Sequence, residues 1–199
     1  MIEIPTLVDR PTFNNIFNMI SARIAERYNQ PDGKTNIKNL VEVGSFLGGS
    51  ACYLAQKIKE DGGRANLFCV DTWDFNNIGP DHARMVDNNK SNYSNFIDNV
   101  NRCDVADIIT PIESDSITAA SEFDDGNIDF LYLDGCHDRE YVYKELEAWY
   151  PKMNENSFIS GHDFNDLGVR DSVERFFAER QHSIVQHGES YLVQLGRGI

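Results

Sequence analysis

The sequence has few basic residues and no cluster of them. It contains 18 Lys and Arg against 32 Asp and Glu, so its formal net charge at pH 7 is −14. Such a surface repels polyanions unless a local basic patch intervenes, and the chain offers no Lys/Arg cluster to form one. We therefore do not expect nucleic acid as a substrate or partner.

Long apolar runs are also missing. No stretch approaches the roughly 18 apolar residues of a membrane span. The first residues, 1–13, have neither the basic start nor the apolar centre of a signal peptide. We expect a cytoplasmic protein with no membrane partner.

The cysteines are few and lack the spacing of a metal or redox motif. Cys52, Cys69, Cys103 and Cys136 form no C-x-x-C pair. Three of them lie in apolar or helical surroundings, so we expect buried thiols rather than disulfides or zinc ligands.

No internal repeat or low-complexity linker divides the chain. With 199 residues, of which 41% are hydrophobic, it fits a single globular domain, 1–199, with a sizeable core. Its N-terminal segment, 1–35, is predicted to be helical, because apolar residues recur there at helical spacing from Phe13 to Tyr28. The segment 72–92 is rich in Asn, Asp and Gly, and we interpret it as a lid loop over the substrate.

A short apolar run that ends in a turn with few side chains is the most informative feature present. It is LVEVGSFLGGS, Leu40–Ser50. Gly44, Gly48 and Gly49 let backbone approach a ligand closely, and a helix beginning near Ser50 would direct unpaired N–H groups into the same crevice. This turn suits a carboxylate or a phosphate. The dinucleotide fingerprint G-x-G-x-x-G and the G-x-x-x-x-G-K-[ST] loop are both absent.

Glu42 is unusual within that run. An isolated buried carboxylate costs on the order of several kcal/mol, so it must lie near water or be paired. A ligand ammonium would pair with it, which predicts a zwitterion held between Glu42 and the helix N-terminus. Two alternatives remain: Glu42 lies at an exposed strand end, or the turn is an ordinary connection between a strand and a helix.

A second apolar strand, 66–70, ends in Asp71. In a βαβ unit, an acidic residue at the tip of the second strand reaches the crevice of the first turn, where it can accept hydrogen bonds from both hydroxyls of a ribose. Asp71 and the glycine turn together indicate a nucleoside ligand. The alternative role for Asp71 is to cap a helix or turn.

Polar residues follow two further apolar strands in the same way. Asp134 and His137 follow the strand 128–133, and the pair His162-Asp163 follows the next strand. Open α/β sheets place their sites at the carboxyl ends of strands, so we expect these side chains to share a catalytic site with Asp71. His137 or His162 could act as a general base toward an acceptor hydroxyl. Capping or surface roles are the alternative for each residue alone.

The alternation of strands and helices predicts an α/β fold with a mostly parallel sheet. Beyond this pattern, several motifs occur in an order and spacing that resemble the class I S-adenosylmethionine-dependent methyltransferases. The likeness is greatest to the bacterial small-molecule branch that includes the macrocin-type sugar O-methyltransferases. The motifs are VEVGSFLGGS, FCVDTWD, SNFIDNV, ITPIESDS, IDFLYLDGCHDREYVYKELEAWYPKM and FISGHDF.

The resemblance implies a Rossmann-like seven-stranded sheet with helices on both faces and an antiparallel last strand. It also implies S-adenosylmethionine as the cofactor and a small-molecule acceptor, such as the hydroxyl of a sugar or natural product. A homo-oligomer is compatible with the sequence. The cofactor contacts that the resemblance implies are Glu42, Gly44, Ser45, Gly48, Gly49 and Ser50 for the methionine part, Asp71 for the ribose, Asp115 and Ser116 for the adenine side, and Asp134.

One departure from the family concerns a metal. Relatives that use a divalent ion have Asp at the Asp134 position and Asp-Asp or Asp-Asn where this chain has His162-Asp163. Imidazole ligates divalent ions, but Mg²⁺ prefers oxygen ligands, so a site on Asp134, His162 and Asp163 would suit Mn²⁺ better than Mg²⁺. A metal-free enzyme, with Asp134, His137 and His162 as its catalytic groups, is the alternative.

Two other classes of function remain open at this point. One is a metal-dependent hydrolase that uses Asp134, His137, His162 and Asp163, which would leave the glycine turn and Asp71 unexplained. The other is a nucleoside-binding protein without catalytic activity.

Overall fold

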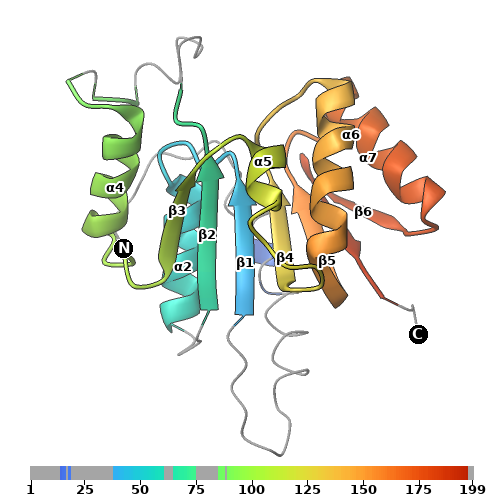
Figure 1. Ribbon diagram of the computed structural model, residues 1–199, viewed down its shortest axis with the longest axis horizontal. Coiled ribbons are helices and arrows are strands. Elements are labelled where there is room, and N and C mark those ends of the chain that lie inside the picture. Colours follow the sequence, from blue (N-terminus) through green and yellow to red (C-terminus); the bar gives the residue numbers. More distant parts are fainter. Residues whose placement is uncertain are drawn as a thin grey trace, which may run out of the picture.

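A computed structural model describes residues 14–16, 18, 38–60, 65–74, 85–87 and 89–196. In this part of the chain the centre is a seven-stranded sheet in the order β3-β2-β1-β4-β5-β7-β6 (Figure 1). Strands β1 to β5 pair in parallel, and β7 lies antiparallel between β5 and β6. The predicted Rossmann-like sheet with an antiparallel last strand is confirmed. The strands are β1 Lys38–Val43, β2 Ala65–Asp71, β3 Ile109–Glu113, β4 Ile128–Leu133, β5 Met153–Gly161, β6 Ile184–His187 and β7 Ser190–Gln194.

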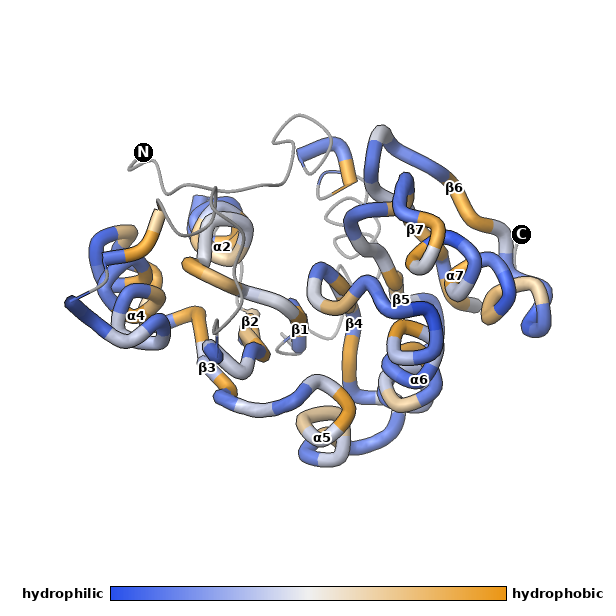
Figure 2. Tube along the Cα trace, turned by 90° about the horizontal axis from the view of Figure 1, so that it is seen from above, coloured by the Kyte–Doolittle hydropathy of each residue, from blue (hydrophilic) through white to orange (hydrophobic). Residues whose placement is uncertain are grey.

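Helices cover both faces of the sheet (Figure 2). Helices α2 and α4 pack on one face, and α5, α6 and α7 pack on the other. None of the described helices combines the length and the apolar character needed to span a membrane. The helices are α2 Gly49–Glu60, α4 Asn92–Arg102, α5 Ser116–Ala120, α6 Arg139–Trp149, the short 3-10 helix η1 Tyr150–Lys152, and α7 Leu167–Glu179.

The alternation of side chains along β1 explains why the core is divided in two. Leu40 packs with α2 and α4, whereas Val41 and Val43 pack with the helices of the other face. Successive strand residues point to opposite faces, and both faces are covered, so the central strands are apolar throughout rather than alternating. By the same alternation Glu42 is directed to the Leu40 face of the sheet, into apolar surroundings.

Two predicted segments fall largely outside the described residues. Of the N-terminal helical segment, 1–35, the described residues Asn14–Ile16 and Asn18 are helical, and Ile16 is buried in the core with α2. The predicted lid loop, 72–92, is described only in part, and its last residue, Asn92, already belongs to α4.

The thiols match the expectation from their spacing. Cys52, Cys69 and Cys103 are buried and free, and Cys136 is free and exposed. No disulfide or C-x-x-C zinc site involves them.

Candidate active site

The loops that follow β1, β4 and β5 are joined by backbone hydrogen bonds at one edge of the sheet. The amide of Asp134 donates to the carbonyl oxygen of Val43 at 2.9 Å, and the amide of His162 donates to that of Leu133 at 3.0 Å. Because the strands are parallel, their carboxyl ends all meet here. The strand-end residues Asp71, Asp134, His162 and Asp163 therefore lie at one edge of the sheet, and Asp134, His137, His162 and Asp163 line one pocket there.

The glycine turn between β1 and α2 is tight and depends on glycine. Gly44 has a φ of +83°, and a Cβ at this position would lie 2.1 Å from the backbone oxygen of Asp134. Gly48 has a φ of +80°, and a Cβ there would lie 3.0 Å from the Phe96 ring. Helix α2 starts immediately afterwards, at Gly49. The predicted helix N-terminus therefore follows the turn directly.

Glu42 is buried in β1, with only 1% of its surface exposed. Burial raises the pKa of its carboxyl to about 7, and the nearby hydroxyls of Ser50 and Ser45 offset this in part. Neither carboxylate oxygen has a hydrogen-bond partner of good geometry in the described part of the chain. The alternative of an exposed strand end is therefore wrong, because Glu42 lies between β2 and β4 in the middle of the sheet.

The Asp71 carboxylate binds the backbone of two neighbouring turns. One oxygen accepts from the amide of Phe46 at 2.8 Å and the other from the amide of Trp73 at 2.7 Å. Phe46 and Trp73 both have a φ of 47°, in the left-handed region that costs about 1–2 kcal/mol for a residue with a Cβ. Asp71 thus has the capping role considered as its alternative. Each oxygen keeps a further lone pair, so a ligand hydroxyl can still bind.

Asp115 and Ser116 have structural partners at the end of β3. The Asp115 carboxylate accepts backbone hydrogen bonds from the first turn of α5 and is also bonded by the Tyr141 hydroxyl. Ser116 is buried, and its hydroxyl accepts from the indole of Trp149 on α6 at 3.0 Å. Their contact with the adenine side of a cofactor stays a prediction.

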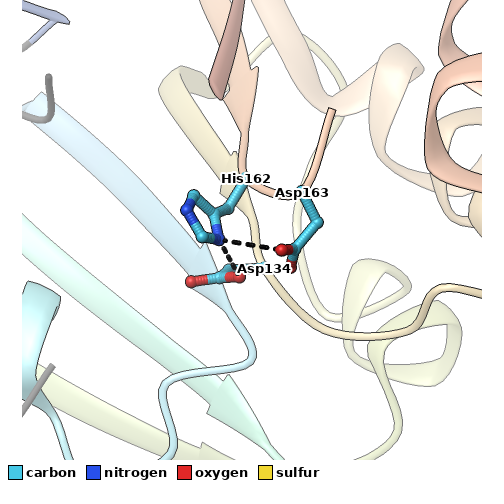
Figure 3. A group of neighbouring side chains, drawn as sticks. All are labelled: Asp134, His162 and Asp163. Carbon is cyan, nitrogen blue, oxygen red and sulfur yellow. Dashed lines mark ion pairs between the residues drawn. The ribbon is translucent and has the colours of Figure 1, made fainter. Parts of the chain in front are cut away.

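Asp134, His162 and Asp163 form one cluster (Figure 3). The His162 Nδ1 atom lies 3.5 Å from Oδ1 of Asp134 and 3.3 Å from Oδ1 of Asp163. The side chain of His162 is 7% exposed, that of Asp134 18% and that of Asp163 32%. One ligand atom from each of the three lies within 4.8 Å of the others, which is compact enough to surround a metal ion.

The two carboxylates determine the charge of His162. Asp134, and then Asp163, raise the pKa of the imidazole to about 10, and burial opposes them only in part. The same contact lowers the pKa of Asp163, whereas burial raises that of Asp134. Without a bound cation, His162 is therefore an imidazolium at neutral pH and cannot accept a proton.

His137 joins the cluster from the loop after β4. Its Nε2 atom lies 2.9 Å from Oδ2 of Asp163, and half of its side chain is exposed. A pocket beside the cluster is lined by residues of this loop, by His162 and Asp163, and by Tyr191 of β7. His137 is thus the accessible imidazole at the mouth of the site.

Two acidic residues near the cluster were not predicted from the sequence as site residues. Glu145 of α6 is buried, lines the same pocket, and has its pKa raised to about 7 by burial. Glu189, between β6 and β7, places Oε2 3.8 Å from Nε2 of His162. No local pattern marks either one, since Glu145 looks like part of the polar face of a helix and Glu189 like a turn residue.

Known proteins share the fold. A family model described as a methyltransferase domain matches residues 41–164. A search among curated protein sequences gives no significant match. The O-methyltransferase NovP is similar, with a TM-score of 0.69 and 14% identity over 96% of this chain and 82% of that one.

Two other structures are similar to about the same extent. A methyltransferase from Geobacter sulfurreducens has a TM-score of 0.61 and 17% identity over 96% of this chain and 82% of its own. The calicheamicin methyltransferase CalS11 has a TM-score of 0.63 and 12% identity over 92% of this chain and 80% of its own. At these identities, the likeness shows the fold alone.

Proposed function

The chain belongs to the family of the methyltransferase domain, and from this premise we propose that it transfers a methyl group from S-adenosylmethionine to a hydroxyl oxygen of a small molecule. The observation that carries the proposal is the buried Glu42 carboxylate, which lacks a hydrogen-bond partner among the described residues and lies directly before the glycine turn. A cationic ligand group that pairs with the carboxylate would explain why this buried acid lacks a partner.

The residues around the turn fit the parts of this cofactor. The ammonium of its methionine part would pair with Glu42, and its carboxylate would meet the amides at the start of α2. The ribose hydroxyls would donate to Asp71, whose oxygens each keep a lone pair. The support comes from Glu42 and Asp71 together, since each matches a different part of one molecule.

Asp134, His162 and Asp163 fit a divalent cation. Two carboxylate oxygens and the His162 Nδ1 atom offer donors within 4.8 Å of one another. Without a metal, an imidazolium supplies positive charge at the same place. The mixed nitrogen and oxygen set favours Mn²⁺ or a softer ion over Mg²⁺. A divalent ion bound here would lower the pKa of an acceptor hydroxyl.

The chain's own residues would align the acceptor and receive its proton. In the transfer, the acceptor oxygen forms a bond to the methyl carbon as the carbon–sulfur bond breaks, and the hydroxyl proton goes to a base. We assign the base to His137: its Nε2 atom lies 2.9 Å from Oδ2 of Asp163, and a proton on Nε2 that faces this carboxylate would leave the Nδ1 lone pair free. Alignment of the two reactants contributes the larger share of the lowered barrier, roughly 7–11 kcal/mol at best. A general base contributes less, because it raises the rate by about 10²–10⁴-fold.

The acceptor class is proposed by analogy. NovP is named an O-methyltransferase and CalS11 a calicheamicin methyltransferase, and both share the fold. We infer that the acceptor of this chain is the hydroxyl of a sugar or another natural product, as the resemblance to the macrocin-type branch implies.

A product assay tests the proposal. The protein is incubated with S-adenosylmethionine, Mn²⁺ and a panel of sugar and phenolic compounds, and S-adenosylhomocysteine is measured by mass spectrometry. We expect its formation to depend on one acceptor and to fall at least about 10²-fold in His137→Ala. The exposed α7 residue Glu174 supplies a control, because Glu174→Ala should leave the rate unchanged. Conversion of a panel compound without S-adenosylmethionine would contradict methyl transfer.

A further inference from the structure

We infer that Glu189 is a positioning residue for His162: its carboxylate accepts a hydrogen bond from Nε2–H, and this directs Nδ1 toward Asp134 and Asp163 as a cation ligand. The inference rests on the cation site of the proposed function and assigns to it a residue from the hairpin of β6 and β7. Glu189 touches neither the acceptor nor the cation in this account.

One ring nitrogen of His162 is buried. His162 is 7% exposed, and its Nε2 atom makes no hydrogen bond within the described residues. In Figure 3 this nitrogen lies on the side of the ring away from Asp134 and Asp163. A buried ring N–H without an acceptor costs about 1–3 kcal/mol, so a partner is expected.

Glu189 is placed to be that partner. Its Oε2 atom lies 3.8 Å from Nε2, less than about 1 Å beyond the length of a normal hydrogen bond. Its side chain is 60% exposed, so a rotation can close the gap without disturbing the core. Among the described residues, it is the acidic group within ion-pair distance of this nitrogen.

The backbone of Glu189 is held against the loop that carries the site. Its carbonyl oxygen accepts from the amide of Phe164 at 2.7 Å, and its Oε1 atom accepts from Asn165 at 3.2 Å. Phe164 and Asn165 directly follow the pair His162-Asp163. The hairpin tip is thus fixed to the same loop as the imidazole, so the geometry does not depend on a distant contact.

The chemistry of metal-bound imidazole gives this contact a purpose. A neutral ring carries one proton, and it can ligate through Nδ1 only if that proton is on Nε2. Histidines that ligate metals usually donate their other N–H to a carboxylate or carbonyl, and loss of that partner typically costs 10–100-fold in metal affinity. Glu189 supplies this acceptor on the side opposite the two aspartates.

The inference is tested by a titration of the full chain with Mn²⁺. Electron paramagnetic resonance measures the concentration of the free ion and so gives the affinity. We expect Glu189→Ala to weaken Mn²⁺ affinity about 10–100-fold. Glu189→Gln should regain most of the affinity, because its amide oxygen still accepts the hydrogen bond although the charge is lost. Glu174→Ala is the control for removing an exposed carboxylate. Affinity for S-adenosylhomocysteine, measured by calorimetry on the same samples, should be equal in all four proteins.

The outcomes separate this inference from the function on which it rests. Wild-type Mn²⁺ affinity in Glu189→Ala would overturn the role of Glu189 while leaving the cation site in place. Equal losses in Glu189→Ala and Glu189→Gln would also overturn it, because charge alone would then be responsible. If the wild-type protein binds S-adenosylhomocysteine but no Mn²⁺, the inference falls together with the cation site, and methyl transfer stands.

Discussion

The carboxylate of Asp71 and the amide of Phe46 are joined by a hydrogen bond of 2.8 Å. This bond ties the end of β2 to the middle of the glycine turn after β1, and it stabilises a left-handed residue, since Phe46 has a φ of 47°. One carboxylate therefore holds the turn in shape and faces the place where a ribose is expected. Its loss should damage both functions at once.

Substitution of the two acidic residues on the cofactor side should separate their roles. We expect Asp71→Ala to weaken binding of S-adenosylhomocysteine and of adenosine by tenfold or more, since each lost hydrogen bond to a charged group is worth about 1.5–3 kcal/mol. Glu42→Gln should weaken S-adenosylhomocysteine by a similar factor and leave adenosine nearly unchanged. Calorimetric titration measures all four constants, and equal losses for both ligands in both variants would refute the assignment.

The stability of the protein should fall as pH rises, because of Glu42. Its folded-state pKa of about 7 lies above 4.5, the ordinary value for a glutamate. The folded state therefore binds the proton more tightly than the unfolded state between these values, so the contribution is present below about pH 4.5 and lost as pH rises through 7. The loss is on the order of 3 kcal/mol.

The variant Glu42→Gln isolates this effect. Its unfolding free energy relative to wild type, from urea melts, should rise by a few kcal/mol between pH 5 and pH 8. Glu174→Gln, on the exposed face of α7, should track the wild type throughout. A constant difference between Glu42→Gln and the wild type over this range would show that Glu42 does not titrate inside it.

Gly44 should be intolerant of any side chain. A Cβ there would lie 2.1 Å from a backbone oxygen of Asp134, and the φ of +83° adds strain. Gly126→Ala provides a matched control, since Gly126 has a φ of +71° but nothing within 4 Å of a Cβ. We expect about 1–2 kcal/mol of destabilisation for Gly126→Ala, from strain alone, and a clearly larger loss for Gly44→Ala in the same urea melts. Similar losses in the two variants would contradict the close approach of β1 and the Asp134 loop.

Removal of Asp163 should abolish cation dependence and spare cofactor binding. Asp163→Ala takes away one proposed cation ligand and the ion-pair partner of His137 Nε2. We expect loss of most turnover and of Mn²⁺ binding, so that the free-ion resonance stays at its protein-free intensity, with S-adenosylhomocysteine affinity within about twofold of wild type. If wild-type turnover survives a chelator unchanged, the divalent cation has no part in the reaction.

Strands that are apolar along their length were predictable, and their polar ends were not. The sequence predicted a strand from Leu40, but β1 begins at Lys38. The first two residues of β1 are polar, and they belong to the strand because they pair with β2. The strand β3 extends through Pro111, which an edge strand tolerates. In β5, the polar residues 154–156 precede the apolar part of the strand, and a register shift against β4 accommodates them.

The candidate site was predictable to the extent that topology fixes it. Asp71, Asp134 and Asp163 were found because residues after parallel strands converge at one edge of the sheet. Glu189 was not, because it reaches His162 only after the hairpin of β6 and β7 folds back along β5. No spacing along the chain encodes a contact that depends on two strand pairings.

The central claim is that the crevice at the carboxyl edge of the sheet binds the methyl-donor cofactor. Titration calorimetry of the wild-type protein with S-adenosylhomocysteine tests it most directly. We predict saturable binding with one ligand per chain, no comparable binding of NAD, and a higher melting temperature, equivalent to about 2.7 kcal/mol at 100 times the dissociation constant. The absence of both heat and thermal shift at millimolar S-adenosylhomocysteine would contradict the claim.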